Sequence, residues 1–132
     1  MARPRAAELT ERELEVMHVF WKDGEQTVAA ARDALAESGR ELAYTTVATL
    51  VRILTDKKFL LQTNEERPLR FRPIRTFEDV STNLVSDMVK KVFGGSREQL
   101  LVRLWGQKKP TAAEREILER VLSEKPVKGD GK

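Results

Sequence analysis

The segment from residue 44 to residue 58 has two contrasting faces, and this contrast limits most sharply how the chain can fold. Apolar side chains recur at positions i, i+3, i+4 and i+7, the spacing of a helix that packs one face into a core. These residues are Val47, Leu50, Val51 and Leu54. The opposite face carries short polar side chains and a single arginine, without the Glu/Lys pairs that commonly cover a solvated helix face. The pattern predicts a helix that is anchored by its inner face and presents an uncluttered outer face.

Two shorter amphipathic helices are expected before this segment, and a β-hairpin after it. A capping box at Thr10–Glu13 opens a helix over residues 10–22, and Thr27 caps a second helix. Two short extended runs follow, over residues 59–63 and 69–72, with a turn-like cluster between them. Three helices followed by a hairpin form the layout of a winged helix-turn-helix domain.

The rest of the chain is expected to form three more amphipathic helices, the first of which ends at Gly94-Gly95. Roughly 45 residues make a poor independent core, so their wide apolar surface needs a cover. A second copy of the chain is the simplest cover, because most oligomers are symmetric homodimers. The alternative is that these helices fold back on the first domain. The expected dimer interface contains Phe77, Val80, Leu84, Met88, Val92, Leu101, Leu104 and Trp105.

These elements define the expected organisation of the chain. The fold class is mainly α with a small β-hairpin. Residues 1–76 are predicted to form a winged helix-turn-helix domain, and residues 77–124 a three-helix dimerisation domain. Residues 125–132 contain one proline and two glycines and are expected to form a flexible tail.

Basic charge is concentrated around the expected hairpin. Residues 52–76 carry seven Lys or Arg and three Asp or Glu, a net charge of +4, whereas residues 1–51 carry a net charge of −3. Such a stretch indicates an anionic partner. The second helix of a helix-turn-helix enters the DNA major groove, which is about 12 Å wide and accommodates short outward side chains, while arginines of the hairpin suit phosphates. The expected DNA-binding residues are Tyr44, Thr45, Thr46, Ala48, Thr49, Arg52, Arg67, Arg70 and Arg72.

Other interpretations of these features stay open. A threonine-rich helix face also occurs on ordinary protein surfaces, and arginines on an edge strand discourage pairing with other strands. A winged helix can bind a protein instead of DNA, although that role tolerates bulkier or acidic residues on the outer face. A regulator with a small-molecule pocket between its two parts would need convergent polar groups among the C-terminal apolar faces, and the sequence shows none.

Composition excludes most enzymatic and metal chemistry. The chain has no cysteine and one histidine, which rules out disulfides, thiolate ligands, cysteine nucleophiles and histidine-cluster zinc sites. His18 lies on the first amphipathic helix, where we expect a structural role. We therefore predict no enzyme, no cofactor and no metal. No apolar run exceeds four residues, whereas a membrane span needs about 20, so we expect no membrane insertion and a cytoplasmic protein.

Three stretches of the sequence resemble the penicillinase-repressor family. Residues 9–21 resemble the opening helix of the family, residues 42–54 its recognition helix and residues 57–60 the exit from that helix. The run Tyr44-Thr45-Thr46-Val47 is the most specific element, and the resemblance covers nearly the whole chain. It implies a bacterial transcriptional repressor, homodimeric through its C-terminal helices, that binds double-stranded operator DNA with dyad symmetry.

The resemblance also bears on how repression would be relieved. In β-lactam-responsive members, signalling through a membrane sensor metallopeptidase leads to cleavage of an Asn-Phe bond in the helix after the glycine break. The matching pair here is Arg103-Leu104, the candidate cleavage site. A pocket shaped for Asn would not readily accept Arg, and the cysteines of copper-responsive members are absent. We therefore expect neither penicillin-type cleavage nor copper sensing, while proteolysis by a sensor with another preference stays open.

Overall fold

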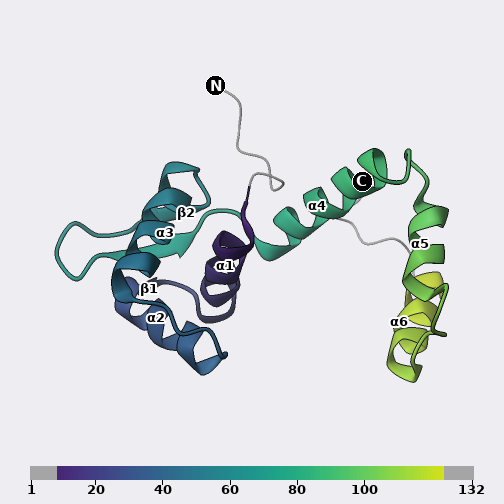
Figure 1. Cartoon of the computed structure of the whole chain (residues 1–132), viewed down its shortest axis with the longest axis horizontal. Coiled ribbons are helices and arrows are strands. Elements are labelled where there is room, and N and C mark those ends of the chain that lie inside the picture. Colours follow the sequence, from purple (N-terminus) through teal and green to yellow (C-terminus); the bar gives the residue numbers. More distant parts are fainter. Residues whose placement is uncertain (1–8, 124–132) are drawn as a thin grey trace. The chain divides into compact units, whose positions relative to one another are not determined.

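The computed structural model describes residues 9–123, which form six helices and a three-stranded sheet (Figure 1). The elements follow in the order α1 (Glu11–Asp23), β1 (Gln26–Thr27), α2 (Val28–Glu37), α3 (Tyr44–Asp56), β2 (Leu60–Gln62), β3 (Arg70–Pro73), α4 (Phe77–Lys91), α5 (Arg97–Trp105) and α6 (Ala112–Ser123). This confirms a mainly α fold with a small β-hairpin. The expected tail at 125–132 lies outside the described residues.

Helices α1, α2 and α3 pack around one apolar core. The predicted stripe of α3 is confirmed, because Val47, Val51 and Leu54 are buried and Leu50 packs at the edge of the core. Helices α1 and α2 begin with side-chain caps, in which the hydroxyls of Thr10 and Thr27 accept backbone N–H bonds. Helix α3 has no such cap. Its position therefore depends on the packing of its apolar face.

The hairpin strands β2 and β3 form the wing, which we define as residues 60–73, and a third strand completes the sheet. The strand order is β1-β3-β2, and both pairings are antiparallel. The sequence predicted the hairpin but not β1, since Gln26-Thr27 was expected only to lead into α2. The side chain of Phe71 is buried in the core. Because side chains alternate along a strand, Arg70 and Arg72 lie on the opposite, exposed face of the sheet.

Two buried charged residues tie the ends of these elements together. Glu13 is 4% exposed; its carboxylate accepts the backbone N–H of Thr10 at 2.9 Å and forms an ion pair with Lys57 Nζ at 3.0 Å. The guanidinium of Arg75 lies over the Phe59 ring, 5.0 Å from its centre, while the Arg75 carbonyl accepts the Trp21 indole N–H at 2.8 Å. The end of α3 and the exit from the wing are therefore both joined to α1.

The chain divides into two compact units after Met88, rather than after residue 76 as expected. The reason is that the first turns of α4 pack on the N-terminal core. Val80 is 1% exposed and belongs to that core, and the Phe77 ring lies 5.4 Å from the ring of Trp21. Val80 therefore packs within its own chain, which corrects its expected place at an interface between copies.

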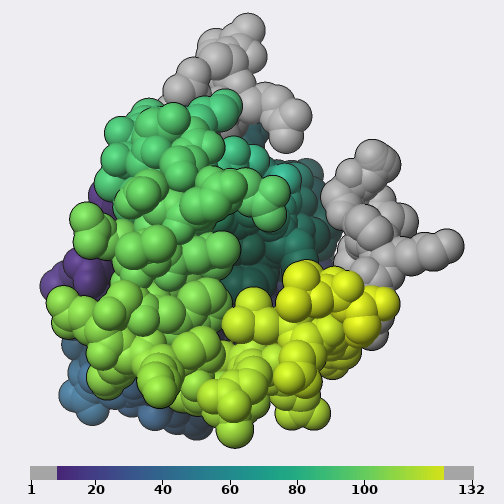
Figure 2. Space-filling view, turned by 90° about the vertical axis from the view of Figure 1, so that its right-hand side faces the viewer, coloured from purple at the N-terminus to yellow at the C-terminus, as the bar shows by residue number. Residues whose placement is uncertain are grey.

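The second unit contains helices α5 and α6, which lie side by side in both views (Figure 1, Figure 2). The Glu114 carboxylate joins them, because it accepts the Trp105 indole N–H at 3.0 Å and the Thr111 backbone N–H at 2.9 Å. The Thr111 backbone bond and then the Trp105 bond hold the Glu114 pKa below its usual value. Neither helix buries a residue completely. Among residues 9–123, no helix combines the length and hydropathy that crossing a bilayer requires.

The capping box and ion pair of Glu13 give a first prediction. Glu13→Ala should lower the free energy of unfolding by about 2 kcal/mol, because it removes the bond from the Thr10 backbone N–H to the Glu13 carboxylate, one half of the capping box, and the ion pair with Lys57. Urea unfolding followed by circular dichroism measures the change. Glu11→Ala, at an exposed position in the same first turn, is the matched control and should cost about 0.5 kcal/mol. Equal losses in the two variants would contradict the role given to Glu13.

Candidate nucleic-acid interface

The outer face of α3 is exposed and short-chained, as the sequence predicted. Thr45, Thr49 and Arg52 are exposed, whereas Thr46 and Ala48 are half-buried. Tyr44 begins the helix and is held from α2, where the Arg32 guanidinium lies 5.8 Å from its ring centre. No bulky side chain stands between the two exposed threonines. The face can therefore approach a flat or grooved partner closely.

A groove of about 540 Å³ runs between α3 and the wing. We call it the α3–wing groove. Its lining includes Thr49 and Arg52 from α3, and Arg67 with Leu69 from the wing. The N-terminal end of α2 contributes Thr27, Val28 and Ala29. Two of the predicted arginines thus reach one concave surface from different elements.

A second, smaller hollow of about 280 Å³ lies on the other side of the same helix face. Its lining comprises Thr45, Thr46, Thr49, Leu50 and Arg12. Thr49 therefore borders both hollows. Arg12 was not among the predicted DNA-binding residues, because it lies inside the α1 capping box and nothing in the local sequence distinguishes it from an ordinary surface arginine.

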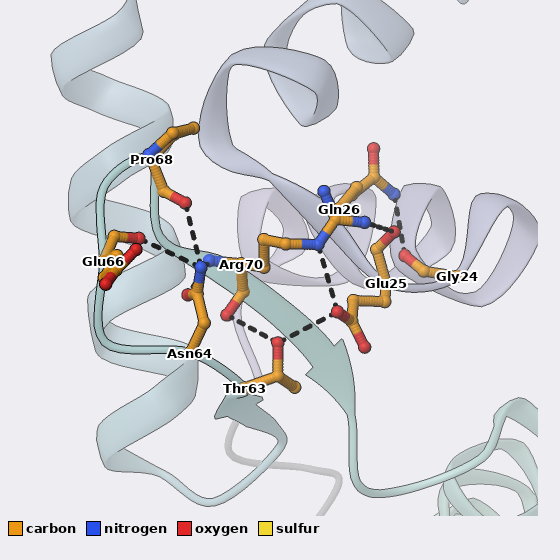
Figure 3. A network of polar contacts seen from close by, with 8 residues as sticks. All are labelled: Gly24, Glu25, Gln26, Thr63, Asn64, Glu66, Pro68 and Arg70. Atoms are coloured by element: carbon orange, nitrogen blue, oxygen red, sulfur yellow. Dashed lines mark hydrogen bonds and ion pairs between the residues drawn. The ribbon is translucent and has the colours of Figure 1, made fainter.

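The structure separates the three predicted wing arginines. Arg67 lines the α3–wing groove, whereas Arg70 and Arg72 are absent from its lining and extend from the outer face of the sheet. Arg70 turns toward the segment before β1, where its Nε donates to Glu25 Oε2 at 3.1 Å (Figure 3). Thr63 donates its hydroxyl to the same carboxylate oxygen, also at 3.1 Å. Glu25 was not predicted as a site residue, since sequence spacing does not show that β1 pairs with β3.

Asn64 closes the turn of the wing. Its amide group donates to the carbonyls of Glu66 and Pro68, at 3.0 and 3.3 Å, and its carbonyl accepts the Arg70 backbone N–H at 2.8 Å (Figure 3). The Arg67-Pro68 peptide bond inside this turn is cis. These bonds define the loop from which Arg67 extends.

Two ion pairs modify the charge of this unit. The hydrogen bonds from Arg70 and then Thr63 hold the pKa of Glu25 below its usual value. On the side of α1, Arg40 pairs with Glu15, which lowers the pKa of that carboxyl chiefly through the hydrogen bond and raises the pKa of the guanidinium. Both carboxylates stay ionised at neutral pH. Arg40 and Arg70 each therefore have a carboxylate partner within the chain.

The residues expected at a dimer interface differ in their exposure in the single chain. Leu101, Leu104, Met88 and Val92 are exposed, Leu84 packs against the N-terminal core and Trp105 is half-buried. Helix α6 adds an apolar set that was not predicted for the interface. It consists of Ile117, Val121 and Leu122, of which Leu122 is 84% exposed. The i, i+4 spacing of Ile117 and Val121 in the sequence indicates a shared apolar helix face and could have identified these residues.

The candidate cleavage pair lies in the last turn of α5. Arg103 and Leu104 are both exposed, and the Leu104 side chain is 58% accessible. The bond between them is nevertheless part of a regular helix that ends at Trp105. A peptidase that needs an extended substrate would therefore have to unwind this turn.

Comparison with known proteins agrees with the resemblance drawn from the sequence. The sequence model of the penicillinase repressor family matches residues 9–124. The transcriptional regulator BlaI of Mycobacterium tuberculosis is 33% identical over 111 residues, which cover 83% of this chain and 78% of that protein. Its description as a transcriptional regulator supports the prediction that the chain is not an enzyme.

Solved structures support the fold. The complex structure described as hsRosR-S1 aligns with a TM-score of 0.54 and 15% identity, over 89% of this chain and 92% of that chain. RosR of H. salinarum aligns with a TM-score of 0.50 and 12% identity, over 89% of this chain and 94% of that chain. At these identities the likeness concerns the fold alone.

Proposed function

The chain belongs to the penicillinase-repressor family, and on that premise we propose that it is a dimeric transcriptional repressor of a dyad-symmetric operator. The observation that carries the proposal is the exposed, short-chained face of α3 beside the α3–wing groove. There Thr49 and Arg52 of α3 line the same surface as Arg67 of the wing. Helix, groove and wing belong to one compact unit, so they meet DNA together.

Each element has a distinct task in this proposal. Helix α3 enters the major groove, where the methyl and hydroxyl groups of Thr45 and Thr49 meet base edges. Arg52 reaches a guanine or a phosphate, and Arg67 reaches a phosphate of the backbone beside the helix. Arg12 lies beside the threonines at the smaller hollow and adds a further cation. Base reading and backbone attraction thus come from different residues.

This division of tasks predicts two different kinds of DNA-binding defect. Thr49→Val replaces the hydroxyl with a methyl group of similar size, so it should change base preference by about 1–3 kcal/mol at a few positions. Arg67→Gln should weaken binding to all sequences alike and flatten the slope of log K against log salt by about 2 per dimer, one phosphate per protomer. Fluorescence anisotropy on duplexes selected from a random-sequence library measures both.

Arg120→Gln serves as the matched control for the arginine substitution, because it removes the same charge from an exposed position on α6, outside the proposed surface. It should leave base preference and nearly all of the salt dependence unchanged. If Thr49→Val and Arg67→Gln affected every sequence equally, the assignment of reading to α3 and of backbone contact to the wing would be wrong.

The proposed dimer rests on the exposed apolar residues of the C-terminal helices. Leu101, Leu104, Val121 and Leu122 leave large apolar side chains in solvent in the single chain. A symmetric second copy would cover them. It would also join two weak half-site contacts into one tight complex, because the second contact becomes intramolecular once the first has formed.

Leu104→Asp tests the dimer directly. A carboxylate in a desolvated apolar interface is strongly unfavourable, so this variant should sediment as a monomer at concentrations where the wild type sediments as a dimer. Analytical ultracentrifugation over a concentration series makes the comparison. Gln99→Asp places the same charge at another exposed position of α5 and is the control. A wild type that stays monomeric at every concentration would contradict the proposal.

We further propose that relief of repression does not run through a penicillin-type sensor peptidase. The Asn-Phe pair of the β-lactam-responsive members is replaced here by Arg103-Leu104, so the side chains at the bond are the reason for this proposal. Incubation of the wild type with such a peptidase domain should leave the chain intact by mass spectrometry. The variant Arg103→Asn, Leu104→Phe restores the pair and should be cut, because α5 buries no residue completely and unwinds readily. A clean cut of the wild type at Arg103-Leu104 would instead favour a membrane sensor metallopeptidase as its partner.

A further inference from the structure

The contact between Glu25 and Arg70 crosses the sheet from one chain segment to another. Glu25 precedes β1, and Arg70 opens β3, the central strand. Besides the 3.1 Å bond between Arg70 Nε and Glu25 Oε2, Arg70 Nη2 lies 3.5 Å from the Glu25 carbonyl oxygen (Figure 3). The carboxylate of Glu25 thus meets the Nε–H of the guanidinium, and its main-chain carbonyl faces Nη2. The pair as a whole carries no net charge.

A third residue fixes the carboxylate in this place. The Thr63 hydroxyl donates to Glu25 Oε2, and the Thr63 backbone N–H donates to the Arg70 carbonyl at 2.8 Å. Thr63 follows β2, so three segments of the sheet meet at Glu25 (Figure 3). The half-exposed carboxylate is therefore a built part of the wing and not an isolated surface acid.

The position of the pair matters for the wing as a DNA-binding element. Arg67 lines the α3–wing groove, but Arg70 does not. A cation whose charge is compensated by a carboxylate of the same protein releases fewer counterions when DNA binds, so it adds less to sequence-independent attraction. That attraction sets non-specific binding, and specificity is the ratio of specific to non-specific affinity.

We propose that Glu25 is a specificity-determining residue that acts as an internal counter-ion for Arg70. It keeps this arginine on the sheet and withholds its charge from DNA phosphates, so that Arg67 supplies the charge of the wing at the groove. The inference rests on the proposed function, since it concerns how the same wing meets DNA. It also departs from the sequence-based expectation that Arg70 is a phosphate ligand.

A double-mutant cycle over Glu25→Gln and Arg70→Gln tests the proposal. Glu25→Gln should release one cation per protomer, so the salt slope should steepen by about 2 per dimer on a scrambled duplex. The Glu25→Gln protein should bind this duplex more tightly than the wild type does. That difference in affinity should shrink about tenfold between roughly 50 and 200 mM salt. The double variant should return to the wild-type slope, because it again carries no net charge at this place.

Glu66→Gln provides the matched control, since Glu66 lies in the turn of the same wing and meets Asn64 only through its backbone carbonyl. Its effect on DNA affinity should be the same with Arg70 or with Gln at position 70. The change in DNA affinity caused by Glu25→Gln should be large when residue 70 is Arg. In the Arg70→Gln background it should be no larger than the change caused by Glu66→Gln. An unchanged salt slope for Glu25→Gln, or an effect that is independent of Arg70, overturns the proposal.

A measurement without DNA separates this inference from the proposed function. In carbon-detected NMR the pKa of the Glu25 carboxyl should lie below its ordinary value in the wild type, because Arg70 donates to it, and Arg70→Gln should raise that pKa. If the pKa does not move, the pair is not formed in solution and the inference fails whatever the DNA data show. If the pKa moves but no variant binds DNA, the proposed function fails and takes the inference with it.

Discussion

The packing of the apolar stripe of α3 is the contact on which the rest of the molecule depends. Helix α3 has no side-chain cap at its start, so its own ends stabilise it little. Its burial against α1 and α2 fixes the rotation of the helix about its axis. One rotation of the helix about its axis sets the direction of every side chain on it. When Val47 and Val51 point into the core, Thr45 and Thr49 therefore face outward.

Polar contacts then hold the neighbours of α3 at fixed places. The Glu13–Lys57 pair joins the end of α3 to the start of α1, and the Trp21 indole binds the carbonyl of Arg75 after the wing. Both contacts are partly buried, and burial strengthens hydrogen bonds and ion pairs because the local dielectric is lower than that of water. The wing is thereby attached at its base, and the turn closed by Asn64 lies at its far end. Arg67 owes its position beside α3 to this support.

Sequence reasoning recovered what periodicity and local signals encode. The stripe of α3, the caps at Thr10 and Thr27 and the hairpin all follow from residues close together in the chain. Strand β1 could not be predicted in this way, because two residues carry no periodic pattern and only their pairing with β3 makes them a strand. The same non-local pairing brings Glu25 to Arg70, so the division of the wing arginines could not be anticipated. The unit boundary was placed too early because the α4 pattern is continuous, and tertiary contact alone shows that Val80 joins the first core.

The two faces of α3 are independent in what they contribute, and this has a consequence for how such a protein can diverge. Thr45, Thr49 and Arg52 are exposed and lie outside the core. Substitutions at exposed positions of this kind usually change stability by less than about 0.5 kcal/mol. Under the function proposed above, a lineage could therefore exchange these side chains one at a time, and so move to new target sequences, while the fold tolerates every intermediate. Changes at Val47 or Val51 have no such freedom, so regulatory networks can be rewired through one side of a single helix.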